Sequence, residues 1–377
     1  MTDLVKLLER LVAIDSVNPA LVPGGAGEAE IASFIAGWAA DAGLEVTVEE
    51  PVDGRPSVVA VARGTGGGRT LMLNAHTDTV GVAGMERPFE PRIENGRLFG
   101  RGAYDMKAGL AAAMAVTAAA RERQLRGDVI LAAVADEEHA SIGTAAVAER
   151  WRADAAIITE PTDMTITTAH KGFTWLEIET HGVAAHGSRP DLGVDAIVKM
   201  GHILVAIEEL DRQLRAGDGH PLSGTGSIHA SLISGGQELS SYPERCRLDV
   251  ERRTIPGESP ELVERQVREL IERIAAADPE LRAELRMGLV REPYEIAADA
   301  PIVELVRRHA TVVTGSEPEI TGGSGWMDSA ILGAAGIPTV IFGPSGEGAH
   351  AVEEWVELES VEQCARVLLA VVEEFCG

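Results

Sequence analysis

Four short apolar runs, each followed by a histidine or by carboxylate residues, constrain the fold of this 377-residue chain more than any other feature. In chain order they are TLMLNA (70–75) before His76, DVILAAVA (128–135) before Asp136-Glu137-Glu138, AAIIT (155–159) before Glu160, and PTVIFG (338–343) before a glycine-rich loop that reaches His350. Runs of this length and composition are typical of strands that are buried on both faces of a sheet. We therefore interpret the four runs as strands.

Segments with helical periodicity alternate with these strands. The first is amphipathic, because leucines and valine recur at the spacing of one helix face between residues 4 and 12. Further helices are expected near 28–42, 108–121, 142–150, 301–314, 327–335 and 359–375. Alternation of strands and helices predicts an α/β domain with a largely parallel sheet.

The pattern changes near residue 171. The segment 173–180 (FTWLEIET) alternates between apolar and polar residues, as do 227–234 and 247–253, and such alternation is typical of half-exposed strands. Long helices are expected at 194–214 and 262–274, the second with Ser259 as its cap. We therefore predict an inserted α+β domain at 173–287 within a catalytic domain formed by 1–172 and 288–377.

Charge and cysteine usage exclude several classes of protein. The net charge of −26 repels phosphate backbones and anionic lipids, so neither nucleic acid nor a membrane is an expected partner. The N-terminal segment carries four charged residues and lacks the apolar core of a signal peptide. The three cysteines lie far apart and match neither a disulfide framework nor a zinc knuckle. We expect a cytoplasmic protein.

The polar groups that follow the four strands predict a metal site. In open α/β sheets ligands bind beyond the carboxyl ends of the strands, so these groups are expected to converge. Asp105, in the glycine-flanked segment 100–109, is a further carboxylate of the same kind. Imidazole and carboxylate ligands suit zinc, and also manganese or cobalt. Five such groups exceed the needs of one catalytic zinc and suit two cations that share a carboxylate.

The acidic pair Glu137-Glu138 indicates the reaction. Adjacent residues at a strand end point to different sides, so one carboxylate can bind metal while the other stays free. A free carboxylate beside water whose pKa is lowered by cations is a suitable general base.

Several motifs, in order along essentially the whole chain, resemble the zinc aminoacylase and carboxypeptidase family, which includes acetylornithine deacetylase and succinyl-diaminopimelate desuccinylase. The matching segments are His76-Thr-Asp78, Gly100-Arg-Gly-x-x-Asp105-Met-Lys, Asp136-Glu137-Glu138, Thr159-Glu160-Pro161, His186-Gly-Ser-Arg-Pro190, and Gly348-Ala-His350. The resemblance implies that the inserted domain is a lid and dimerisation domain. It also implies that the peptide bond after Asp105 is cis.

The same resemblance implies roles for individual residues. By this resemblance His76 and Glu160 hold one metal, Glu138 and His350 hold the other, Asp105 bridges both, Glu137 is the general base, and Asp78 orients His76. His186 is implied to stabilise the oxyanion from across a dimer interface, and Arg253 to meet a substrate carboxylate. Ser240 and Asp328 are further candidates for substrate binding. Ser240 stands where relatives often have asparagine, and Met327 precedes Asp328 where they often have threonine.

These features predict a deacylase that hydrolyses the amide bond of a small N-acyl L-amino acid with two metal ions, zinc or else cobalt or manganese. A dipeptidase or a glutamate-type carboxypeptidase of the same family is the alternative within this chemistry. A non-catalytic binding protein is disfavoured because Glu137 is present. A binuclear phosphoesterase is disfavoured because the chain is acidic and lacks a phosphate-binding loop.

Overall fold

The computed structural model describes residues 3–377, and their contacts divide the chain into two compact units. Unit 1 contains the described part of Met1–Thr168 together with Ile296–Thr321 and Met327–Gly377, and unit 2 contains Ala169–Glu295 and Gly322–Trp326. These limits lie four and eight residues from those predicted at 172/173 and 287/288, and the short segment 322–326 is an addition to the second unit. Residues 1 and 2 of the predicted catalytic domain lie outside the described part of the chain.

The sheet that carries the four predicted strands lies in unit 1. Its order is β1-β2-β6-β3-β7-β15-β8, formed by Glu45–Glu49, Ser57–Ala62, Val129–Val134, Leu71–His76, Ala155–Ile158, Thr339–Ile341 and Ile166–His170. The four predicted strands β6, β3, β7 and β15 are adjacent and parallel, whereas β1, β2 and β8 pair antiparallel. The predicted α/β class with a largely parallel sheet is therefore confirmed.

Helices cover both faces of this sheet, which explains why its strands are apolar throughout. The helices of unit 1 are α1 (Leu4–Val12), α2 (Ala29–Asp41), α3 (Ala108–Arg121), α4 (Ile142–Arg150), α7 (Pro301–Thr314), α8 (Ser329–Ala334) and α9 (Leu358–Cys376). Leu71 and Leu73 belong to the core beneath α1, α2, α3, α7 and α9, whereas Met72 faces a second core with α4 and α8. No helix within residues 3–377 is long and apolar enough to cross a membrane.

A small sheet of unit 1 joins two segments that carry predicted site residues. Its order is β16-β17-β5-β4, formed by Gly346–Glu347, Trp355–Glu357, Arg97–Phe99 and Arg92–Glu94. The segment with Asp105 follows β5, and the loop with His350 connects β16 to β17. Because β17 pairs with β5, these two segments start from neighbouring strands although they lie about 250 positions apart in the sequence.

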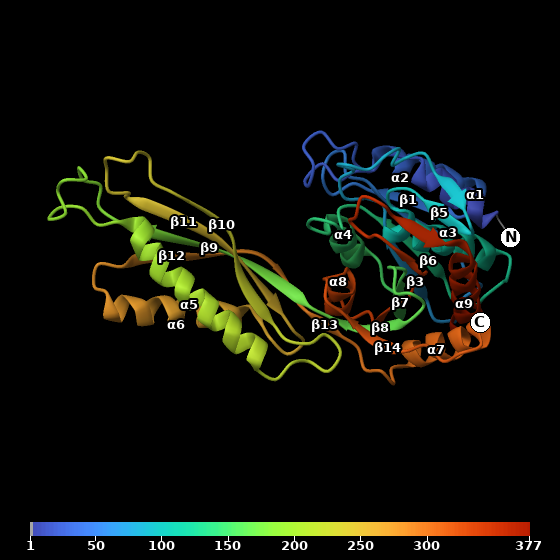
Figure 1. Ribbon diagram of the computed structural model, residues 1–377. Helices are drawn as coiled ribbons and strands as arrows, with labels where there is room; N and C mark the ends of the chain where they lie inside the picture. Colours follow the sequence, from blue (N-terminus) through green and yellow to red (C-terminus); the bar gives the residue numbers. More distant parts are fainter. Residues whose placement is uncertain (1–2) are drawn as a thin grey trace. The chain divides into compact units, whose positions relative to one another are not determined.

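Unit 2 contains a four-stranded antiparallel sheet covered by two helices. The sheet order is β10-β11-β9-β12, formed by Ser227–Gly235, Arg245–Thr254, Gly172–His181 and Arg282–Arg291. Figure 1 shows α5 (Ala196–Ala216) and α6 (Pro260–Ala277) on one face of this sheet. Ser259 accepts the N–H of Leu262 and Pro260 is the first helical residue, so the predicted start of α6 is confirmed. The short strands β13 (Tyr294–Glu295) and β14 (Ile320–Gly323) pair with β8.

Candidate metal centre

His76 is the last residue of β3, and its ring is held in one orientation. The side chain is only 1% exposed, and Nδ1 lies 2.9 Å from the main-chain oxygen of Asp78. A carbonyl only accepts, so Nδ1 carries a proton, and Nε2 is the nitrogen that faces the carboxylates. Nε2 lies 3.2 Å from Asp105 Oδ1 and 3.5 Å from Glu160 Oε1. His76 is therefore prepared to bind a cation through Nε2, together with two carboxylates.

Asp105 lies in an irregular turn, Ala103–Lys107, in which its own backbone is not helical, and a buried carboxylate holds this turn in place. Glu354 Oε1 accepts the N–H groups of Tyr104 and Asp105 at 2.9 and 3.0 Å, and its Oε2 accepts a bond of 2.6 Å from Arg101. The Asp105–Met106 peptide bond is cis, as the family resemblance implies. With this turn fixed, Asp105 presents Oδ1 to His76 and Oδ2 to His350.

His350 approaches Asp105 from the loop between β16 and β17. Its backbone is left-handed, with φ of 62°. Gly348, two residues earlier, also has a positive φ, of 91°. His350 Nε2 lies 3.4 Å from Asp105 Oδ2 and 3.1 Å from Glu138 Oε2. The side chain is 58% exposed, unlike that of His76. One carboxylate thus stands between two imidazoles, one buried and one open to solvent.

The separation of Glu137 from Glu138 has a different cause from the predicted one. Strand β6 ends at Val134, and Asp136 turns the chain with φ of 69°, so the pleat of a strand cannot direct the two side chains. The prediction that they diverge at a strand end is therefore wrong. A turn separates them instead: a carboxylate oxygen of Glu137 lies within 4.8 Å of ligand atoms of His76 and Glu160, and one of Glu138 lies as near to those of His76 and Asp105.

The carboxylate of Asp78 holds this turn through hydrogen bonds with its main-chain N–H groups. Its Oδ1 accepts the N–H of Glu137 at 3.1 Å, and its Oδ2 accepts the N–H of Glu138 at 3.2 Å. The same Oδ1 lies 3.6 Å from His76 Nδ1, beyond hydrogen-bond distance, and the main-chain oxygen of Asp78 binds the ring instead. Asp78 thus contacts His76 through its backbone and the acidic pair through its side chain.

The electrostatics of the cluster favour a bound cation. Burial, followed by the neighbouring charges of Asp105 and Glu138, holds the pKa of Glu160 well above its ordinary value. Burial would likewise raise the pKa of Asp105, but hydrogen bonds from His350 and His76 outweigh it and lower that pKa. The same carboxylates, Asp105 and then Glu138, raise the pKa of His350 to about 10. Carboxylates this close together repel one another when ionised, and a bound cation would offset that repulsion.

The donor set fits divalent cations. Imidazole nitrogens and carboxylate oxygens from five residues lie within a few ångströms of one another, and no cysteine takes part among the described residues. Glu138 Oε1 is buried and has no hydrogen-bond partner among residues 3–377. A buried carboxylate oxygen without a partner is costly, and a cation would satisfy it.

The remaining predicted site residue of unit 1 is Asp328, which lies immediately before α8. Its side chain is buried and accepts a hydrogen bond of 2.5 Å from Thr144 of α4. Burial is the main reason why the pKa of Asp328 is raised to about 6. Asp328 is thus held between two helices behind the acidic cluster.

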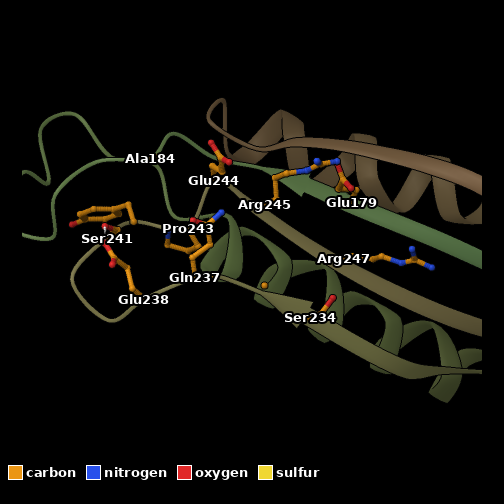
Figure 2. Close-up of a pocket in the computed structure, with 13 residues that line it drawn as sticks. Glu179, Ala184, Ser234, Gln237, Glu238, Ser241, Pro243, Glu244, Arg245 and Arg247 are labelled. Carbon is orange, nitrogen blue, oxygen red and sulfur yellow. Dashed lines mark hydrogen bonds and ion pairs between the residues drawn. The ribbon is translucent and has the colours of Figure 1, made fainter.

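Three predicted residues lie in unit 2, at opposite ends of its sheet. His186 and Ser240 are exposed and adjacent, because the N–H of Gly187 donates to the Ser240 oxygen at 2.7 Å. Beside them lies a cavity of about 510 Å³, bordered by Glu238 and Ser241 (Figure 2). Arg253 lies near the far end of β11, about 27 Å along the strand from Arg245 at its start, which is the end nearer to Ser240 in the sequence. Within one chain, the sheet therefore keeps Arg253 apart from His186.

Sequence reasoning assigned no role to the residues that support the ligands, although the segment Glu354-Trp-Val356 fits the resembled family. Glu354 holds the turn with Asp105, while Asn18 and Arg55 contact the carboxylates beneath the acidic pair. None of the three follows an apolar strand, which was the signal used for the ligands. Asn18 and Arg55 each precede a proline, and a polar residue before proline is an ordinary loop feature. Only their burial in the folded chain marks them.

Comparison with known proteins identifies the family. The family model for Peptidase family M20/M25/M40 matches residues 72–374, which include every proposed metal ligand. The chain belongs to this family. The M20 family fold is also seen in a Bacillus subtilis protein described as a dinuclear metal-binding peptidase, at a TM-score of 0.76 and 18% identity, with 99% of this chain and 98% of that chain covered.

Two relatives named for amide hydrolysis are each 30% identical to this M20 family member. One is N-formyl-4-amino-5-aminomethyl-2-methylpyrimidine deformylase from Halalkalibacterium halodurans, with 99% of this chain and 94% of the relative covered. The other is acetylornithine deacetylase from Myxococcus xanthus, with coverage of 98% and 97%. The chain is thus an enzyme, a hydrolase of the M20 family.

Proposed function

We propose that the protein hydrolyses the amide bond of a small N-acyl L-amino acid with two divalent cations. The observation that carries this proposal is the position of Asp105, whose two oxygens lie 3.2 and 3.4 Å from the Nε2 atoms of His76 and His350. Paired cations in hydrolases commonly share such a carboxylate. The relative named acetylornithine deacetylase supports an N-acyl amino acid as the substrate class.

The ligands divide into two sets around Asp105. His76 and Glu160 would hold one cation, because Glu160 Oε1 lies 3.5 Å from His76 Nε2. Glu138 and His350 would hold the other, since their ligand atoms are 3.1 Å apart. Zinc suits this mixture of imidazole and carboxylate, with cobalt and manganese as the alternatives.

Glu137 is the proposed general base. When bound, the two cations lower the pKa of water and polarise the amide carbonyl. Glu137 takes one proton from the water that attacks the amide carbon, then delivers it to the nitrogen as the carbon–nitrogen bond breaks. The second water proton passes from the new carboxyl group to the amine, so a carboxylate and an ammonium group leave. Burial, and then the charge of Glu160, raise the pKa of Glu137 well above its ordinary value, which suits a group that must first accept and then donate a proton.

Substrate contacts are proposed for residues of both units. Asp328 of unit 1 and Ser240 and Arg253 of unit 2 would bind parts of the substrate, Arg253 through a carboxylate. His186 would stabilise the oxyanion from the partner subunit of a homodimer. The position of Arg253 far from His186 in one chain supports this arrangement, because two chains can supply both residues to one site.

The dimer would form along β10, one of the two edge strands of the unit 2 sheet. Leu232 and Ile233 on this strand are 69% and 54% exposed, and Val205 on the neighbouring helix α5 is 67% exposed. An exposed, apolar edge strand is a template for pairing with a second chain. We expect Leu232→Asp to convert the dimer to monomers, as measured by light scattering after gel filtration. Val312→Asp, at an equally exposed valine on α7, should leave the mass unchanged.

Mixing two inactive variants tests whether His186 acts across that interface. His186→Ala and Glu137→Gln chains, dissociated and reassociated together, should recover roughly a quarter of wild-type activity, because half of the dimers are mixed and each has one complete site. A wild-type mass for Leu232→Asp, or no recovery on mixing, would contradict the dimeric site.

A substrate panel tests the proposed reaction. We expect the highest kcat/KM for acetyl- or succinyl-amino acids, with zinc and cobalt supplied in separate assays. Dipeptides and folyl-glutamate-like amides represent the alternative of a dipeptidase or glutamate-type carboxypeptidase. A formylated aminopyrimidine is included because a relative of equal identity is named for it. If only dipeptides were cleaved, the proposed substrate class would be wrong, whereas the proposed metal chemistry would still hold.

We also propose that the enzyme works in the cytoplasm. Cys246, Cys364 and Cys376 are buried thiols without a disulfide. Burial raises the pKa of Cys364 to about 12 and is the main reason why that of Cys376 is raised to about 11, so both stay protonated and inert. Reduced, unreactive thiols suit a reducing compartment.

A further inference from the structure

A chain of buried polar side chains lies beneath the acidic pair in unit 1. Arg55 forms two bonds of 2.6 Å with Glu28 and one of 2.8 Å with Asp136 Oδ1. Asn18 Nδ2 donates to the same Asp136 oxygen at 3.0 Å and to Asp78 Oδ2 at 2.8 Å. All five residues are at most 9% exposed. A buried network of this size requires an explanation, because every charge in it has lost its water.

The network ends at the turn that separates the two catalytic carboxylates. Asp136 immediately precedes Glu137, has a left-handed backbone, and accepts the N–H groups of Ala140 and Ser141 at its own carbonyl. A left-handed conformation in a residue other than glycine persists only where its surroundings enforce it. The side chain of Asp136 is therefore the point at which the network controls the direction of the following residues.

The segment 55–57 binds both residues that precede Glu137. Arg55 holds the Asp136 carboxylate, and the hydroxyl of Ser57 accepts the N–H of Ala135 at 3.0 Å. The planar fork of arginine lets one side chain bind Glu28 through two bonds and still donate to Asp136. Lysine, with a single charged nitrogen, cannot reproduce this geometry.

We infer that Arg55 is a positioning residue for the proposed hydrolysis: through Asp136 it fixes the turn that directs Glu137 and Glu138 to their separate places. This inference rests on the proposed function, since it assigns Glu138 to a metal and Glu137 to the base. Asp78 completes the support from the other side by accepting the N–H groups of both glutamates. Without Arg55, Asp136 would keep only the Asn18 amide, which it shares with the like charge of Asp78.

The test compares Arg55→Gln with the double variant Glu28→Gln/Arg55→Gln. The single change leaves Glu28 buried without its cation, so it disturbs the fold as well as the turn. The double change restores the charge balance around Glu28 but still leaves Asp136 without a guanidinium. We expect the double variant to regain wild-type thermal stability, yet to bind zinc about 10–100-fold more weakly at one of two sites and to lower kcat by a similar factor.

Zinc binding is measured by competition with a chromogenic chelator, so it does not depend on knowing the substrate. Arg63→Gln is the matched control, because Arg63 directly follows β2, is half exposed, and pairs with Glu45 and Asp128. A double variant with wild-type zinc affinity at both sites would overturn the inference even if kcat changed. If no panel substrate is cleaved but zinc binding still weakens, the proposed function fails and the role of Arg55 in positioning Glu138 stands.

Discussion

Replacing Glu137 by glutamine is expected to lower kcat by about 10²–10⁴-fold while both metal ions remain bound. Glutamine has the same shape and keeps the main-chain N–H that donates to Asp78, so the turn is preserved. It cannot accept the proton of the attacking water. The loss should therefore appear in kcat, with KM nearly unchanged, because the interaction is made only as the reaction proceeds.

Two other glutamates, Glu138 and Glu353, provide controls for this result. Glu138→Gln should reduce the metal content itself, since Glu138 Oε2 lies 3.1 Å from His350 Nε2 in the proposed second cation site. Glu353→Gln, at an exposed position in the His350 loop, should change neither quantity. Metal content is measured by plasma mass spectrometry beside steady-state kinetics. Wild-type kcat in metal-loaded Glu137→Gln would refute the assignment of the base.

Removal of the metal ions is the second change with a large expected effect. We expect chelation to abolish activity and to lower the thermal midpoint by several degrees at pH 8, with both restored by added zinc. A ligand present at a thousand times its dissociation constant stabilises the folded state by about 4 kcal/mol. Without the metal ions, the acids concentrated around Asp105 would depend on the protonated imidazoles of His350 and His76 for positive charge.

The loss of stability on chelation should increase as the pH rises. The pKa of Glu160 and that of Glu138 are raised in the fold, mainly by burial. A carboxyl group with a raised pKa holds its proton more tightly when folded, so the metal-free fold is favoured at low pH. That advantage is lost as pH rises from the unfolded value of about 4.3 through the folded pKa.

Metal binding displaces these protons, so its own contribution grows with pH. The difference in thermal midpoint between metal-loaded and chelated protein should be larger at pH 8 than at pH 5.5. Calorimetry at both pH values measures it. An equal difference at the two values, or no effect of chelation, would show that the acidic cluster does not bind cations in the folded protein.

Much of unit 1 follows from sequence because its strands are buried on both faces. Leu71, Met72 and Leu73 are all fully buried, so the run is continuously apolar and easily recognised. The strands that were not predicted include β1, β2, β8 and β12. β2 (SVVAVA) was missed although it is as buried and apolar as β3. β1 and β12 are edge strands whose exposed and polar residues weaken the pattern, and β8 carries two threonines and a histidine. An edge strand carries fewer apolar residues than a central strand, because it has a neighbouring strand on one side only and is open to water on the other.

The sequence by itself indicated which residues are candidate ligands and base. Imidazoles and carboxylates after buried strands meet at one edge of a parallel sheet, and the resemblance to a known family implied the individual roles. Only the tertiary structure decided how they are held. Glu354 reaches Asp105, and Arg55 reaches Asp136, across distances of 249 and 81 residues in the chain. Such contacts leave no periodic trace in a sequence, because they depend on the meeting of loops whose conformations are set by the packed core beneath them.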